Sequence, residues 1–246
     1  MASLTWLEYF QTPAGLTDLA WQEKAFARFS INKNGDRALQ VAMPEINALT
    51  RTAIRTCVLA CDRCVSRSDD RRITVLCSSR QIPFADASFD LIAWPHGFDA
   101  TSEPNKTLSE IVRLLAPNGI LLTTFFNDSG SWALLKKLRR ASPLPANATP
   151  VSVQKAKSFL DTVGLTCEEG HFGVYGINKD PTHAQKTAIE KAGDRWWPTL
   201  SNIVFLAARK NDIRPGLVGK MTFSVNPVNG GKRVLVGTEN NKTQVN

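Results

Sequence analysis

The sequence predicts an α/β fold with a doubly wound sheet of mostly parallel strands, and three observations support this prediction. Two short apolar runs, 89–94 and 120–126, flank a single amphipathic segment. Within that segment Leu108, Ile111 and Leu115 recur at helical spacing. The second run is apolar almost throughout, as a parallel strand covered on both faces should be. Strand, helix and strand therefore form a βαβ unit, whose crossover should be right-handed.

The other elements follow from hydrophobic periodicity and from the turn residues at their ends. Residues 1–30 are predicted to be helical and to pack against the sheet through a set of apolar side chains. These side chains are Trp6, Leu7, Phe10, Leu16, Leu19, Ala20, Trp21 and Phe26. Pro44 is expected to begin a short helix, because its fixed φ suits the first helical position. The expected strands are 38–43, 56–60, 73–77, 89–94, 120–126, 165–174 and 202–208. The later helices are expected at 108–115, ended by 117–119, at 131–140, and at 151–163, ended by Gly164.

The composition is that of an α/β domain with short additions. Of the 246 residues, 43% are hydrophobic, which is enough to bury a sizeable core. We predict one domain over residues 1–210, in which 1–35 form an N-terminal helical segment. Residues 211–246 contain six Asn and five Gly with little apolar periodicity, so a disordered tail is predicted there.

The same sequence gives expectations about the compartment. No run approaches the ~20 apolar residues that span a bilayer, so no membrane partner is expected. The N-terminus carries Glu8 and has no basic flank before an apolar core, which is not the pattern of a signal peptide. The five cysteines are an odd number without a disulfide framework. We therefore expect a reduced, cytoplasmic protein.

The charge is basic and unevenly distributed. The net charge is +8, with arginines gathered between residues 51 and 72 and a second basic group over 136–140. Such groups could attract RNA or another polyanion. A solvated basic face is the favoured interpretation, because no RNA-binding motif accompanies the charges.

Three short motifs of the βαβ region resemble the class I S-adenosylmethionine (SAM) dependent methyltransferases. The family pattern "LPF…SFD" corresponds to Ile82-Pro83-Phe84 and Ser88-Phe89-Asp90, and the helix end "RVLKPGG" corresponds to 113–119. The chain is also similar, over roughly residues 6 to 216, to a bacterial subgroup with type 11-like methyltransferase domains. The segments that carry this likeness are 39–44, Pro95-His96, Phe126-Asn127, Ser131-Trp132 and 193–198. The resemblance implies a Rossmann-like sheet of seven strands whose last strand is antiparallel.

The resemblance also implies SAM as cofactor, bound where the strands end. At the first exit most of the family carry a D-x-G-x-G-x-G loop, whose glycines let the backbone approach the methionine moiety of SAM. This chain has Val41, Ala42 and Met43 there, followed by Pro44, and no glycine. Pro44 also lacks an N–H donor. We therefore expect a degenerate loop in which Val41, Ala42 and Met43 contact the cofactor.

The next strand exits supply the other cofactor residues that the resemblance implies. Asp62 stands close to the family's acidic residue that binds the ribose hydroxyls, although a surface turn aspartate is an equal alternative. After the third strand, Ser79 or Gln81 could hydrogen-bond to adenine. Ile82 could pack on adenine, and Trp94 ends the fourth strand beside it. More often such apolar residues belong to the core.

His96 follows the fourth strand and is the candidate catalytic base, because a histidine titrates near neutrality. The alternative is a histidine that is hydrogen-bonded to loop backbone. Methyl transfer depends mainly on aligning nucleophile, methyl carbon and sulfur, so a base is optional. Asn127 and Trp132 are expected to line the acceptor pocket. Trp196 and Trp197 could stack on a flat acceptor or close the core.

Cys57, Cys61 and Cys64 have the C-x3-C-x2-C spacing of radical-SAM enzymes, in which three thiolates hold a [4Fe–4S] cluster. The motif lies in a β-rich run, has Arg63 where an aromatic residue is usual, and is not followed by repeated βα units. Buried or incidental cysteines are the favoured interpretation. No zinc or phosphate-loop pattern is present, and no metal is predicted.

The resemblance therefore implies a SAM-dependent methyltransferase that transfers a methyl group by direct in-line displacement. Its acceptor is unidentified and could be a small molecule, RNA or protein. The alternative is a catalytically inactive, methyltransferase-like binding or scaffold protein that kept the fold after losing the cofactor. The missing glycines favour this alternative.

Overall fold

The computed structural model describes residues 4–63, 72–138, 142–175 and 200–211, and two short strands near the C-terminus. The chain divides into two units, residues 1–212 and 213–246, which are considered separately. Cys64, Trp196 and Trp197 lie outside the described residues, and so does most of the predicted disordered tail.

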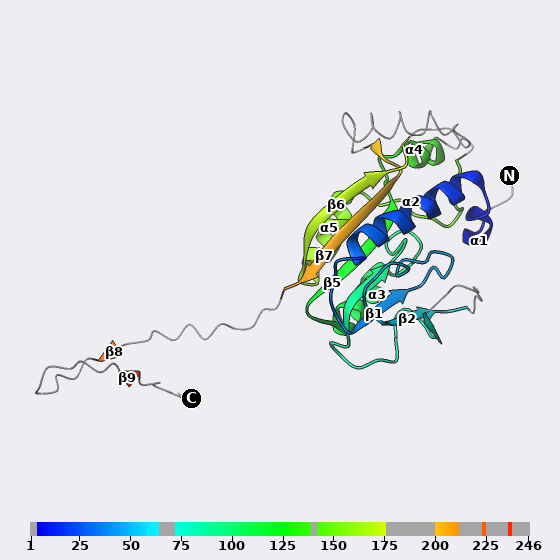
Figure 1. The fold of residues 1–246 in the computed structure, drawn as a ribbon. Coiled ribbons are helices and arrows are strands. Elements are labelled where there is room, and N and C mark those ends of the chain that lie inside the picture. The colour runs from blue at the N-terminus through cyan, green and yellow to red at the C-terminus, as the bar shows by residue number, and fades with distance from the viewer. Residues whose placement is uncertain are drawn as a thin grey trace, which may run out of the picture. The chain divides into compact units, whose positions relative to one another are not determined.

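The first unit is built on one seven-stranded sheet (Figure 1). Its strands are β1 (Arg37–Val41), β2 (Thr56–Cys61), β3 (Ile73–Leu76), β4 (Phe89–Trp94), β5 (Leu115–Phe126), β6 (Leu165–Gly173) and β7 (Ile203–Lys210). The order across the sheet is β3-β2-β1-β4-β5-β7-β6. All pairs from β3 to β5 are parallel, and β7 runs antiparallel to both β5 and β6. The predicted doubly wound, mostly parallel sheet with an antiparallel last strand is confirmed.

Helices cover both faces of this sheet (Figure 1). They are α1 (Trp6–Tyr9), α2 (Pro13–Ser30), α3 (Pro104–Leu114), α4 (Ser131–Lys137) and α5 (Val153–Thr162). One core cluster joins α1, α2 and Trp132 of α4 to one face of the sheet. The other cluster joins α3 and α5 to the opposite face. Inside β4 and the second half of β5 nearly every residue is buried, as two covered faces require.

The face that α2 turns to the core differs from the predicted apolar stripe. Its buried residues include Asp18, Gln22 and Phe26, which follow one another at i+4 spacing and so share one face. Leu7 and Leu16, which were expected to pack inward, are 51% and 56% exposed. Of the segment 1–30 that was predicted to be helical, Trp6–Tyr9 and Pro13–Ser30 form helices, and the core-facing stripe of α2 is partly polar.

Two element boundaries also differ from the prediction. No helix follows Pro44, and residues 44–53 form turns and irregular backbone. Helix α3 ends at Leu114, and the backbone continues directly into β5, so 117–119 belong to a strand.

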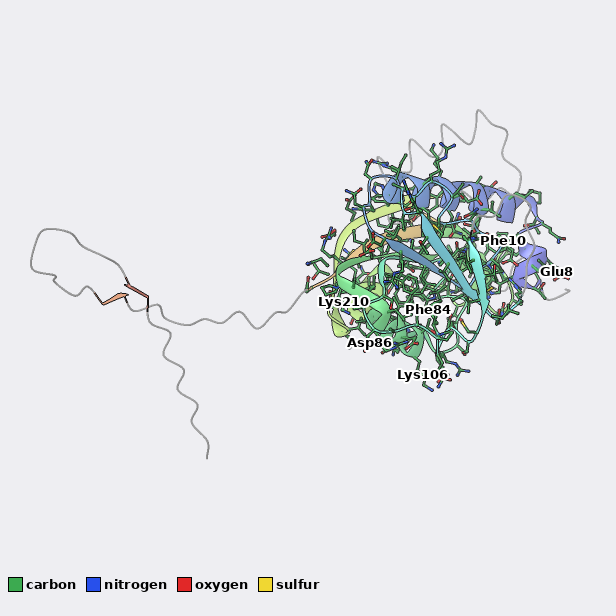
Figure 2. The ribbon with its side chains drawn as sticks, turned by 60° about the horizontal axis from the view of Figure 1, so that its bottom comes forward. Glu8, Phe10, Phe84, Asp86, Lys106 and Lys210 are labelled. Carbon is green, nitrogen blue, oxygen red and sulfur yellow. The ribbon has the colours of Figure 1, made fainter. Side chains whose placement is uncertain are left out.

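Lys210, labelled in Figure 2, donates through Nζ to the carbonyls of Val112 and Leu115, both at 2.7 Å. These bonds satisfy carbonyls at the helix end, where no further turn follows.

Arg113 of α3 ties the loop before β4 to the body of the protein. Its guanidinium donates to the carbonyls of Ile82 (3.1 Å) and Phe84 (2.9 Å), and to the carboxylate of Asp86 (2.6 Å). It also pairs with Glu110 one helical turn away. Phe84 and Asp86 lie close together at this loop in Figure 2. The arginine of the helix motif therefore fixes the loop motif, which explains why the two occur together.

The second unit contains one described feature. Strand β8 (Phe223–Ser224) pairs antiparallel with β9 (Val236–Gly237). The predicted disorder of residues 211–246 otherwise falls outside the described residues. Among the helices that the structure describes, none combines the length and the hydropathy needed to cross a membrane.

Candidate active site

A pocket opens at the carboxyl ends of β1, β2 and β3. It has a volume of about 680 Å³, within the range of roughly 300–1,000 Å³ typical of small-molecule sites. The loop before α3 closes one side, and Trp6 of α1 reaches it from the N-terminal segment. The lining residues are Trp6, Ala42, Met43, Pro44, Cys61, Asp62, Arg63, Leu76, Cys77, Ser78, Ser79, Arg80, Ala100, Thr101, Ser102 and Glu103. This is the edge at which ligands bind in open α/β sheets.

Four of the predicted cofactor residues line this pocket, and four do not. Ala42, Met43, Asp62 and Ser79 form part of its wall. The other four are Val41, Ile82 and Trp94, which are buried in the core at 0%, 2% and 1% exposure, and Gln81, which is exposed but outside the lining.

The loop after β1 takes an unusual backbone conformation. Ala42 and Met43 have φ angles of 58° and 44°, in the left-handed region that favours glycine. For residues with a Cβ this region costs roughly 1–2 kcal/mol each. The loop therefore keeps a glycine-like backbone without glycine. Met43 is 8% exposed and its side chain joins the core, so it borders the pocket without filling it.

Charged side chains surround the mouth of the pocket, and most of them are paired. Arg63 contacts Glu45 at 2.5 Å. Glu103 contacts both Arg80 and Lys106, each at 2.5 Å. The hydrogen bonds from Lys106 and Arg80 lower the pKa of Glu103, which keeps it ionised. Asp62 is exposed on the pocket wall and belongs to none of these pairs.

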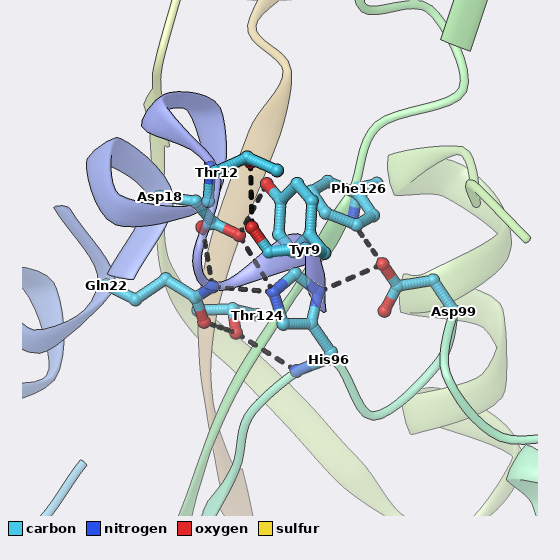
Figure 3. Close-up of polar contacts among 9 residues, drawn as sticks. Tyr9, Thr12, Asp18, Gln22, His96, Asp99, Thr124 and Phe126 are labelled. Atoms are coloured by element: carbon cyan, nitrogen blue, oxygen red, sulfur yellow. Dashed lines mark hydrogen bonds and ion pairs between the residues drawn. The ribbon is translucent and has the colours of Figure 1, made fainter. Parts of the chain in front are cut away.

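At the exits of β4 and β5 the same edge of the sheet is filled by a buried polar network (Figure 3). His96, with a φ of 48°, is 0% exposed. Its Nδ1 lies 3.0 Å from Oδ2 of Asp99, and its Nε2 lies 3.1 Å from Oδ2 of Asp18. Tyr9 donates its hydroxyl to the same Asp18 oxygen at 3.0 Å, and Gln22 donates to Oδ1 at 2.6 Å. The network therefore ties α1 and α2 to the loop after β4.

The two carboxylates determine the charge of His96. Burial by itself lowers the pKa of a histidine, but Asp99 and Asp18 outweigh it and raise the pKa of His96 to about 9. At this pKa the ring is protonated at neutral pH, and each of its two N–H groups donates a hydrogen bond to one carboxylate. If Nε2 loses its proton, the amide of Gln22, 2.6 Å away, can donate to it. Burial and Asp18 likewise raise the pKa of Tyr9 and keep its phenol neutral.

This geometry argues against His96 as a base that meets a substrate. Both ring nitrogens are engaged, and the side chain is absent from the lining of the pocket. The predicted acceptor residues are also buried. Asn127 donates through Nδ2 to the Ser201 carbonyl at 3.0 Å, and the backbone N–H of Trp132 donates to Asn202 at 2.9 Å. Both hold the loop after β5 against the start of β7.

Sequence reasoning missed Asp18, Gln22 and Asp99, which carry the network. The available signal was position on the helix, because Asp18 and Gln22 lie at i+4 spacing in line with Phe26. A polar pair inside a core-facing stripe indicates a buried partner, which here is His96. Asp99 gave no comparable signal, since it lies in a loop.

Among the described residues, Cys57, Cys61, Cys77 and Cys167 form no disulfide with one another. Cys57 and Cys61 lie at opposite ends of β2, about 13 Å apart at ~3.3 Å per residue. They cannot ligate one iron–sulfur cluster in this arrangement, which argues against the radical-SAM interpretation. Within the part of the chain that the structure describes, no group of three or more His, Cys, Asp or Glu could hold a metal ion.

Comparison with known proteins agrees with this architecture. Residues 41–123, about a third of the chain, match a family described as "Methyltransferase domain". A SAM-dependent methyltransferase from Thermotoga maritima is 13% identical, with a TM-score of 0.54 over 82% of this chain and 100% of its own. The chain has the class I methyltransferase fold. No curated protein matches.

Other solved structures with this fold differ in their chemistry. Geranyl diphosphate C-methyltransferase from Streptomyces coelicolor, solved with S-adenosyl-L-homocysteine, is 15% identical, with a TM-score of 0.51 over 79% of this chain and 83% of its own. The (4+2) cyclase SpnF is 14% identical, with a TM-score of 0.50 over 76% of this chain and 80% of its own. Likeness at these identities shows the fold, and function has to be argued from the site.

Proposed function

We propose that this protein is a SAM-dependent methyltransferase whose cofactor occupies the pocket at the exits of β1, β2 and β3. The observation that carries the proposal is the left-handed loop at Ala42 and Met43, which forms the wall of a pocket of about 680 Å³. A backbone conformation of this kind persists only where the surrounding structure requires it, and it is concentrated at functional sites.

The lining residues suit the parts of SAM. Asp62 is an exposed carboxylate at the end of β2, where it can accept hydrogen bonds from the ribose hydroxyls. The backbone at Ala42 and Met43 can lie beside the methionine moiety. Ser79, half-buried after β3, can hydrogen-bond to adenine, while Val41, Ile82 and Trp94 support the wall from the core.

Little further chemistry is required of the protein. When bound, SAM supplies a methyl group on a sulfonium, which makes the methyl carbon electrophilic without a catalytic side chain. The residues of this chain would hold the cofactor and align an incoming nucleophile in line with the methyl carbon and sulfur, which can provide much of the rate. Since His96 is buried, we propose that it organises the loop after β4 and does not act as the base for methyl transfer.

Calorimetric titration with SAM and with S-adenosylhomocysteine tests this proposal. Binding with micromolar Kd supports it. Absence of heat and of any thermal shift at millimolar ligand would contradict binding of the cofactor and therefore the proposed methyltransferase activity. The acceptor class would follow from transfer of labelled methyl from SAM to fractions of small molecules, RNA or protein. We also propose a reducing, cytoplasmic compartment, as the odd number of cysteines without a disulfide framework suggests.

One observation favours a second candidate function, a methyltransferase-like module that binds an adenosyl ligand without transferring a methyl group. The β4 and β5 exits, beside which an acceptor would have to enter, are filled by α1, α2 and the His96 network. Micromolar binding of SAM combined with no labelled product in any fraction would support this candidate over the enzyme.

A further inference from the structure

The left-handed loop after β1 is held from behind by two buried side chains. Gln40 lies inside β1 and is 0% exposed, and Arg72, immediately before β3, is 8% exposed. An amide and a guanidinium in the core are costly unless their hydrogen-bonding groups find partners. Almost all of the bonds seen for these two groups go to the segment 42–48.

The amide of Gln40 makes most of its hydrogen bonds to this segment. Its Nε2 donates to the carbonyls of Ala42 (3.3 Å), Met43 (2.9 Å) and Ile46 (2.7 Å). Its Oε1 accepts from the backbone N–H of Ala48 at 3.1 Å. A single side chain thus hydrogen-bonds to four backbone groups of this segment, namely three carbonyls and one N–H.

Arg72 completes the arrangement. Its Nη1 donates to Oε1 of Gln40 at 2.5 Å and to the carbonyl of Ile46 at 3.1 Å, and its Nη2 donates to the carbonyl of Pro44 at 3.4 Å. The planar fork of the guanidinium can reach these acceptors together, which a lysine could not do. We call this pair of side chains the Gln40–Arg72 clamp.

We propose that Gln40 and Arg72 are positioning residues, and that the clamp holds Ala42 and Met43 in the left-handed conformation that shapes the pocket for its ligand. The inference rests on the proposed function, in which SAM is the ligand of this pocket. Glycine residues can adopt the left-handed conformation without strain. Here the strain of Ala42 and Met43 remains, and the hydrogen bonds of the clamp offset it.

The consequence is a change in the fraction of protein that is competent to bind. Without the clamp the two strained residues relax, and the apparent Kd rises in inverse proportion to the competent fraction. Glycine at both positions makes the left-handed conformation accessible without strain. Glycine substitutions should therefore rescue a protein whose clamp is broken.

The test uses the full chain with S-adenosylhomocysteine as the probe. Gln40→Met, which keeps size and removes every polar contact, should raise the Kd about tenfold or more. Arg72→Lys, which keeps the charge, should also raise the Kd. This variant replaces Gln40→Met in the test if Gln40→Met does not fold. In the Ala42→Gly, Met43→Gly background, adding Gln40→Met should raise the Kd by less than about threefold. Tyr9→Phe removes a buried 3.0 Å bond to Asp18 outside the pocket lining, and should leave the Kd unchanged.

Two outcomes overturn the proposal. One is an unchanged Kd in both clamp variants, and the other is a loss of the same size with and without the glycines, as a merely structural role would give. If the wild-type chain binds no probe, the proposed function fails, and hydrogen exchange decides on the clamp alone. In Gln40→Met the rate of amide hydrogen exchange at residues 42–48 should then rise at least tenfold over wild type, with the rate in β4 as the reference. Equal rates in the two proteins would contradict the clamp.

Discussion

The edge of the sheet where the strands end has two halves, one that contains a pocket and one that is filled by side chains. At the exits of β1, β2 and β3 it is hollow, bordered by exposed ion pairs and a strained loop. At the exits of β4 and β5 it is solid, filled by the ring of His96 between two buried carboxylates. Trp6 belongs to both halves, because it lines the pocket and its ring lies 4.7 Å from that of His96. Substitutions in the hollow half should change ligand binding, and those in the solid half should change stability.

The largest effect is expected from His96→Ala. The variant leaves Asp18 and Asp99 buried without their shared cation, and breaking a buried ion pair in this way typically costs about 3–5 kcal/mol. Urea denaturation measures the free energy of unfolding. His171→Ala is the matched control, since its ring is part-exposed on β6, and it should cost less than about 1 kcal/mol. Equal losses for the two variants would mean that the network adds nothing to stability.

The solid half should also make stability depend on pH. The pKa of His96 is raised to about 9, from about 6.5 in the unfolded chain. Protonation therefore favours the folded state fully below about pH 6.5, and this contribution is lost as the pH rises through about 9. The free energy of unfolding should fall by a few kcal/mol over this range. In His96→Gln the decline should be much smaller, and an identical slope in both proteins would assign the effect to other groups.

In the hollow half, Asp62→Ala should weaken binding of S-adenosylhomocysteine about tenfold or more. The reason is the loss of a charge-assisted hydrogen bond, which is worth roughly 1.5–3 kcal/mol. Its free energy of unfolding should stay within about 0.5 kcal/mol of wild type. Calorimetry measures the Kd, and Asp161→Ala, exposed on α5, is the control with unchanged affinity. Unaltered binding in Asp62→Ala would show that another group holds the ribose.

The smallest effect is expected at the rim of the pocket. Arg80→Ala breaks an ion pair with Glu103 whose side chains are 54% and 36% exposed. Exposed pairs contribute roughly 0–1 kcal/mol and are screened by salt. We expect a loss of less than about 1 kcal/mol that disappears at high ionic strength, as chemical denaturation with and without added salt would show. A larger loss of stability that does not depend on salt would show that Arg80 stabilises the fold as a buried residue such as His96 does.

Most of the sheet could be predicted from the sequence because its central strands are short runs that are apolar almost throughout. The prediction of β4 at 89–94 matches the structure, and β1 and β2 differ from theirs by one or two residues at their ends. Burial on both faces leaves few alternatives for such runs. The topology followed from the resemblance, since periodicity does not give strand order.

The helix predicted at Pro44 failed for a reason that local pattern cannot reveal. Pro44 suits a first helical turn, but a helix needs its backbone groups to pair with one another. Here the Ile46 carbonyl accepts from Gln40 and from Arg72, and the Pro44 carbonyl accepts from Arg72, which is 26 and 28 positions away from these two residues. Such a competition becomes visible only when the tertiary structure is formed.

The candidate site could be predicted in part. The residues that line the pocket stand directly at strand ends, so the positions of Ala42, Asp62 and Ser79 followed from the strand assignment. His96 was singled out at the correct strand end, but its surroundings depend on Asp18, which is 78 positions away. Chemistry at a strand end can thus be located from sequence, whereas burial by a distant helix cannot.

Cys61 and Cys77 face the same hollow, which supplies a built-in chemical reporter of occupancy. Burial raises the pKa of both thiols, so alkylation should be slow near neutrality and faster in mild alkali. An occupant of the hollow would shield these sulfurs, and protection from a maleimide would then rank unknown metabolites by affinity before any acceptor is identified.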